Sequence, residues 1–238
     1  ILQLPEKIAI EKGIQIVICI DEFQQISDFE DSKTFQKKLR SVWQLQQHVS
    51  YCLFGSKKHL MNELFEKKNL PFYKFGDAIY LAKIETKYWI EYICKRFENT
   101  GKHISPELAE EICRLVDNHS SYVQQLSWLL WIRTINTATT EQLSYALEDL
   151  LDQNNILFQS ETENLSAYQM NFLKAIVDGI HTKFSSKEVI SKYNLGTSAN
   201  IVRLKNALLQ KELIETNGKE IVLADPVFGV WFKKEMLY

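Results

Sequence analysis

Hydrophobic and polar positions follow three different patterns along the chain. Residues 14–20 are an almost continuous β-branched run, and residues 49–56 (VSYCLFGS) form a second apolar run. Such runs are typical of strands buried on both faces of a parallel sheet. Residues 78–84 (AIYLAKI) predict a third, shorter strand, and apolar spacing predicts helices at 1–12, 33–47 and 57–68. Strands alternating with helices predict an α/β domain at residues 1–84.

From residue 85 the pattern becomes helical only. Ser105 followed by Pro106 is typical of a helix N-cap and first turn. Apolar residues at helical spacing predict helices at about 86–99, 105–116, 121–134 and 140–152. We therefore expect a small helical domain at residues 85–152.

The last third of the chain has another rhythm. The polar stretch 153–163 predicts a linker, and helices are expected at 166–178, 185–193 and 198–211. Two short strands around Asn217-Gly218 then predict a hairpin, because Asn-Gly favours a tight turn. Three helices followed by a hairpin predict a winged-helix domain at residues 164–238.

Composition changes this picture little. The chain has 28 Lys and Arg against 30 Asp and Glu, so its net charge of −2 predicts no general attraction to DNA or lipid. Cys19, Cys52, Cys94 and Cys113 lie in apolar segments without metal-knuckle spacing, so we expect buried, reduced thiols in a cytoplasmic protein. No apolar run approaches the roughly 20 residues of a membrane span, so we expect no membrane partner.

Two adjacent acids, Asp21 and Glu22, follow the first predicted strand. Ligands of α/β sheets bind beyond the carboxyl ends of the strands. There one acid can hold Mg²⁺ through water while its neighbour polarises an attacking water. Ser56 follows the second predicted strand and could sense a phosphate. A solvated strand end and a helix N-cap are the alternative interpretations of the acid pair and of Ser56.

Several segments together carry a family resemblance. They are IVICIDEFQQI, CLFGSKKHLM, PFYKFGDAIYL, GKHISPELAEEI, YVQQL and DPVFGVWF, in this order. In sequence and spacing they resemble the AAA-type P-loop ATPases of bacteria and archaea grouped with the STAND NTPases. The resemblance implies three parts: an incomplete parallel sheet of the P-loop or RecA-like type, a helical lid domain and the winged-helix domain.

The resemblance also implies site residues. Asp21 and Glu22 match the Walker B acids, the first holding Mg²⁺ through water and the second acting as general base. Ser56 matches the sensor-1 position. Lys74 stands where relatives often place a basic residue, commonly Arg, that contacts the nucleotide. His119 begins a segment that resembles the family's His-Pro-x-Tyr-Val-Gln pattern, with Ser120 in the proline position. A solvated lysine and a capping or surface histidine are the alternatives for these two residues.

The phosphate-binding loop of that family is not in this sequence. None of the eight glycines belongs to a G-x-x-x-x-G-K-[ST] motif, whose backbone N–H groups and Lys hold the phosphates. In the family this loop precedes the Walker B strand. We therefore expect a truncated chain or a naturally degenerate relative. We expect the complete protein to use ATP and Mg²⁺, and this chain to bind neither.

The third helix of the winged-helix domain is the element that would read DNA. Its candidate DNA contacts are Asn200, Arg203, Lys205 and Asn206. Residues 160–238 contain 10 Lys and Arg and 9 Asp and Glu, which is not a strong basic footprint. A protein contact or a purely regulatory domain is the alternative.

Three functions remain open from the sequence. The first is an ATP-dependent switch, in which the sheet domain moves the lid and the winged helix. The second is a DNA-binding transcription regulator. The third is a non-catalytic scaffold or antitoxin-like binding protein, with a protein partner or self-association through the ATPase or winged-helix domain.

Overall fold

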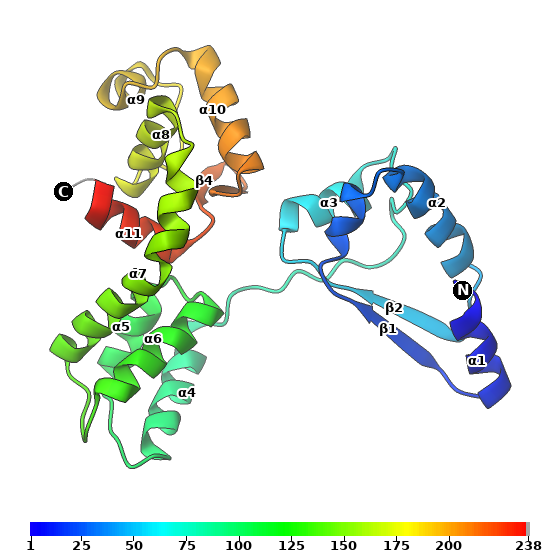
Figure 1. Cartoon of the computed structure of the whole chain (residues 1–238), viewed down its shortest axis with the longest axis horizontal. Coiled ribbons are helices and arrows are strands. Elements are labelled where there is room, and N and C mark those ends of the chain that lie inside the picture. The colour runs from blue at the N-terminus through cyan, green and yellow to red at the C-terminus, as the bar shows by residue number, and fades with distance from the viewer. Residues whose placement is uncertain (237–238) are drawn as a thin grey trace. The chain divides into compact units, whose positions relative to one another are not determined.

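The computed structural model describes residues 1–236, except for the side chain of Lys58, and divides the chain into two units (Figure 1). The first unit, Ile1–Leu81, contains α1 (Leu4–Lys12), β1 (Ile16–Ile20), η1 (Phe23–Asp28), α2 (Ser32–Trp43), β2 (Val49–Leu53) and α3 (Lys58–Glu66). The second unit, Ala82–Tyr238, contains α4 (Thr86–Glu98), α5 (Pro106–Leu115), α6 (Ser120–Arg133), α7 (Thr140–Glu163), α8 (Ala167–Val177), α9 (Lys187–Tyr193), α10 (Ser198–Gln210), β3 (Ile214–Asn217), β4 (Glu220–Leu223) and α11 (Pro226–Met236).

The first unit is built around a parallel pair of strands. β1 and β2 pair in register from Ile16 opposite Val49 to Ile20 opposite Leu53. One face of the pair contacts the core formed with η1, α2 and α3. The buried members of this core are Phe23, Ile26, Leu39, Trp43, Leu64 and Phe72. The predicted α/β layout is therefore present, with helices on one face of the strands.

The other face of β1 and β2 is open to solvent. Val17 is 66% exposed and Phe54 is 47% exposed, and the thiols of Cys19 and Cys52 lie on exposed residues opposite each other in the register. The predictions of strands buried on both faces and of buried thiols at these two positions are wrong. The reason is that the helices described in this unit cover only one of the two faces.

The exposure of the thiols gives a direct prediction. We expect Cys19 and Cys52 to react readily with a thiol-specific disulfide reagent in the native chain. Cys113 is fully buried, and burial raises its pKa to about 11, so we expect it to react only after unfolding. Counting reactive thiols before and after guanidinium addition measures this, with Cys19→Ser and Cys52→Ser as controls. Protection of both thiols in the native chain would show that this sheet face is covered.

The expected third strand is not formed. No residue of the segment 78–84 lies in a described strand, and Ile79 and Leu81 are 84% and 91% exposed. The apolar pattern of this segment suits a strand, but strands need a hydrogen-bonded neighbour, and none of the described residues pairs with it. The prediction of a strand at 78–84 is therefore wrong for this chain.

One hydrophobic core runs through the second unit. It extends from Trp89 in α4 to Phe232 in α11 and includes residues of each helix between them. Residues 153–163, predicted as a linker, continue helix α7, so that prediction is wrong. Phe158 is 1% exposed and packs on Phe228 and Trp231, which explains why this polar stretch stays helical.

The end of the chain has the arrangement expected from its pattern. Helices α8, α9 and α10 precede the antiparallel pair β3–β4, whose turn uses Gly218 at a φ of 61°. α11 then packs on α7 and α8 (Figure 1). In the described part of the chain, no helix has the length and apolar character needed to cross a membrane.

Candidate functional site

The candidate site lies at the carboxyl ends of β1 and β2. Two backbone bonds extend the pairing past the strands: Phe54 N donates to Ile20 O at 2.8 Å, and Phe23 N donates to Phe54 O at 2.8 Å. These bonds hold the residues after each strand side by side. As a result, Ser56 and Glu22 come into direct contact although 34 positions separate them.

Glu22 is held by two side chains. Ser56 Oγ donates to Glu22 Oε2 at 3.0 Å, and the Gln24 side-chain amide donates to the same oxygen. These bonds lower the pKa of Glu22, and the bond from Ser56 has the largest effect. Glu22 is therefore a carboxylate near neutral pH. Glu22 also has a φ of 48°, in the left-handed region that residues with a side chain adopt uncommonly.

Asp21 lies beside this cluster and is exposed. Its Oδ1 accepts a hydrogen bond from the Glu22 backbone N–H at 2.9 Å, which fixes the orientation of the carboxylate. Oxygen donors of this kind suit Mg²⁺, which keeps several waters and takes further ligands from phosphates. Among the described residues no group of three or more His, Cys, Asp and Glu forms a metal site. In the described part of the chain, the acid pair is therefore not part of a closed protein metal site.

Gln24 is the site residue that sequence reasoning missed. It is 2% exposed, it donates to Glu22, and its Oε1 is buried without a hydrogen-bond partner among the residues that the structure describes. Gly55 leaves room for it, because a Cβ there would lie 2.4 Å from Gln24 Oε1 and 2.6 Å from Met61. The available signal was the glycine directly before Ser56, which marks a close approach of side chains to the backbone.

Lys74 lies elsewhere in the first unit. Its φ is 51°, its backbone N–H bonds Phe65 O at 3.0 Å, and its ammonium lies 5.6 Å from the centre of the Tyr73 ring. Arg40 donates to the carbonyls of Pro71 and Tyr73 and so holds this loop. None of the contacts described for Lys74 reaches the acid pair, so its nucleotide role remains a prediction.

His119 belongs to the second unit, where it is the N-cap residue of α6. Its ring lies 4.8 Å from that of Tyr122, and its Nδ1 is buried without a hydrogen-bond partner among the described residues. His119 thus occupies the N-cap position without a side-chain cap hydrogen bond. A nucleotide contact by His119 is still untested.

The predicted DNA-reading residues separate into two groups. Asn200 donates its side-chain amide to Leu195 O at 3.0 Å, next to Gly196, so it stabilises the turn before α10. Arg203 and Asn206 are exposed on α10, and Lys205 is half-buried. Only Arg203 and Asn206 are therefore fully presented to a partner.

Comparisons with known proteins agree with this architecture. The family model described as "Probable winged helix domain" matches residues 156–234. The solved structure of the Walker-type ATPase PABY2304 of Pyrococcus abyssi matches 96% of the chain with a TM-score of 0.73 and 17% identity. The Aeropyrum pernix ORC2 protein, solved as ADPNP-ADP complexes, matches 100% of the chain with a TM-score of 0.57 and 13% identity. A search of curated protein sequences gives no match.

These matches establish the fold. The chain has the fold of the corresponding part of P-loop ATPases, and it ends in a winged-helix domain. It spans 66% of the length of the Pyrococcus ATPase and 71% of the Aeropyrum protein.

Proposed function

We propose that this chain carries the Walker B and sensor-1 part, the helical lid and the winged helix of an AAA-type, STAND-class ATPase that works as a nucleotide-dependent switch. One observation carries the proposal: Ser56 and Gln24 both donate to Glu22 where two parallel strands end, with Asp21 beside them. The ATPase fold of the matched structures agrees with it.

Each residue has a defined task in this proposal. In the complete protein, Asp21 would hold Mg²⁺ through water, and Mg-ATP, when bound, would supply the phosphoryl group that passes to water as ADP leaves. Glu22 takes the proton of that water, in an orientation fixed by Ser56 and Gln24. In this proposal the Ser56 hydroxyl also responds to a phosphate of the nucleotide. The open sheet face with Val17 and Phe54 is the surface that a complete α/β core would cover.

The proposal predicts how this chain behaves with nucleotide. The 238 residues contain no G-x-x-x-x-G-K-[ST] loop to hold the phosphates, and two carboxylates repel a triphosphate. We therefore expect no micromolar binding of Mg-ATP to this chain in calorimetry. The coding sequence around the chain should encode the loop, and a protein that includes it should bind Mg-ATP. Micromolar binding to the present chain, or a longer protein that has the loop and fails to bind, would contradict the proposal.

A second candidate function is DNA binding by the winged helix. It is supported by the exposure of Arg203 and Asn206 on one helix that follows a helix–turn segment. We expect fluorescence anisotropy with duplex DNA to show weak, salt-dependent binding that Arg203→Ala reduces several-fold. Arg96→Ala, which changes an exposed arginine on α4, is the control. Binding that is absent at low salt, or equal in both variants, would favour a protein partner or self-association.

A further inference from the structure

The turn between α5 and α6 has an unusual backbone. Asp117 and Asn118 are consecutive residues with φ values of 48° and 53°. The turn is closed by a bond from Asn118 N to Cys113 O at 2.9 Å. Asp and Asn tolerate the left-handed region better than other residues with side chains, and side-chain contacts on both sides hold this turn.

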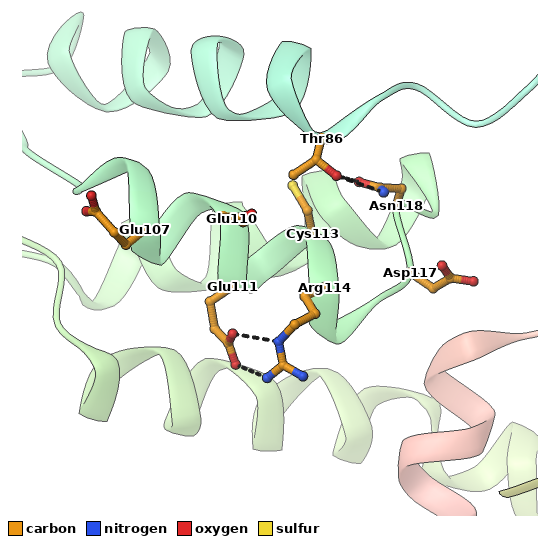
Figure 2. Close-up of a pocket in the computed structure, with 8 residues that line it drawn as sticks. All are labelled: Thr86, Glu107, Glu110, Glu111, Cys113, Arg114, Asp117 and Asn118. Atoms are coloured by element: carbon orange, nitrogen blue, oxygen red, sulfur yellow. Dashed lines mark hydrogen bonds and ion pairs between the residues drawn. The ribbon is translucent and has the colours of Figure 1, made fainter. Parts of the chain in front are cut away.

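On one side the turn is bound to the start of α4. Lys83 Nζ donates to Asp117 O at 2.9 Å and to Asp117 Oδ2 at 2.6 Å. Thr86 Oγ1 donates to Asn118 Oδ1 at 3.2 Å and accepts from Asn118 Nδ2 at 3.0 Å, and Figure 2 shows these two side chains facing each other. Lys83 and Thr86 lie within five positions of Leu81, the last residue of the first unit.

On the other side the turn leads to the first residues of α11. His119 packs its ring on Tyr122, whose hydroxyl donates to Asp225 Oδ2 at a sequence separation of 103. The second oxygen of Asp225 accepts from the backbone N–H groups of Val227 and Phe228 at 2.7 and 3.0 Å. Asp225 thus caps α11 while it is itself held by Tyr122.

The bond from Tyr122 matters because of its surroundings. Tyr122 is 9% exposed, and burial together with the Asp225 carboxylate raises its pKa. Burial and the charge of Asp225 also raise the pKa of Glu161 in α7. Without the Tyr122 hydroxyl, Asp225 would lie near a second carboxyl group with one oxygen unsatisfied, which is unfavourable in a partly buried place.

We propose that the turn 117–119 couples the start of α4 to the first turn of α11, so that releasing Thr86 from Asn118 loosens α11 through Tyr122 and Asp225. The chain segment that leaves the first unit would thereby act on the winged-helix end of the second unit. This coupling requires no nucleotide, so it can be tested separately from the proposed ATPase function.

The test is amide hydrogen exchange of this chain, followed by NMR at Val227 and Phe228. In Tyr122→Phe we expect exchange at these two amides to rise about tenfold, because one buried hydrogen bond to a charged group is lost. In Thr86→Val, which keeps the shape of the side chain, we expect about a threefold rise at the same amides.

Matched controls separate coupling from general destabilisation. Tyr168→Phe changes a tyrosine that is 45% exposed, and Thr100→Val removes the hydroxyl that bonds Trp131 at the far end of α4. Neither should change exchange at Val227 and Phe228. No rise in Thr86→Val, an equal rise in Thr100→Val, or a uniform rise that includes the buried amides of Ile112 and Leu126 would overturn the proposal.

Discussion

Replacement of Trp231 by alanine should destabilise the entire second unit by about 3–5 kcal/mol. Trp231 is 1% exposed, its ring centroid lies 5.6 Å from that of Phe158 and 5.8 Å from that of Phe228, and its Nε1 donates to Asn155 Oδ1 at 2.8 Å. Phe158 and Asn155 belong to α7, which also packs on α6. Loss of the indole therefore weakens a core that helices α4, α5 and α6 share with the winged helix.

The measurement is urea unfolding monitored by hydrogen exchange in α5 and α10, which reports both ends of the second unit. We expect protection to fall by the same free energy in both helices. Trp128→Ala is the control, because this tryptophan is 56% exposed and its loss should change stability by less than about 0.5 kcal/mol. Loss of protection in α10 with unchanged protection in α5 would show that the winged helix and the helices before it have separate cores.

This shared core explains where sequence patterns failed. Residues 153–163 are rich in Asn, Gln and Glu, which is typical of a linker. The information that keeps them helical lies in two places: the capping box of Thr139 and Gln142, and the burial of Phe158 against α11, some 70 positions later. Local composition cannot show a contact of that range, so tertiary packing decided the outcome.

The segment 78–84 shows the opposite failure. Its apolar pattern predicts a strand, and its Ile79 and Leu81 are among the most exposed apolar residues that the structure describes. A strand is a property of two segments rather than one, because its backbone groups need partners. The pattern of a segment shows that it suits a sheet, but it does not show whether a second strand is present to pair with it.

The candidate site was more accessible to sequence reasoning. Parallel neighbouring strands bring their carboxyl ends together, so the contact of Glu22 with Ser56 follows from recognising the two strands. Gln24 could not be found in this way. Its bond to Glu22 depends on the left-handed backbone of Glu22 and on the 3₁₀ turn that starts at Phe23, and neither has a clear sequence signature.

In a longer protein that contains the phosphate-binding loop, Glu22→Gln should lower the rate of ATP hydrolysis by a factor of about 10²–10⁴. Glutamine has the same shape and can still accept the hydrogen bond from Ser56, but it cannot take a proton from water. Mg-ATP binding should be retained, because Asp21 keeps its carboxylate. Single-turnover hydrolysis and calorimetric binding together separate the two effects.

The matched control is Glu30→Gln, which makes the same chemical change at an exposed acid of the first unit outside the Ser56–Gln24 cluster. Its hydrolysis rate should equal that of the unchanged protein. Ser56→Ala should give an intermediate loss, because it removes one of the two donors that orient Glu22 while the bond from Gln24 remains. Equal rates in the Glu22→Gln and Glu30→Gln variants would show that Glu22 is not the general base, and the acid pair would then be a solvated strand end.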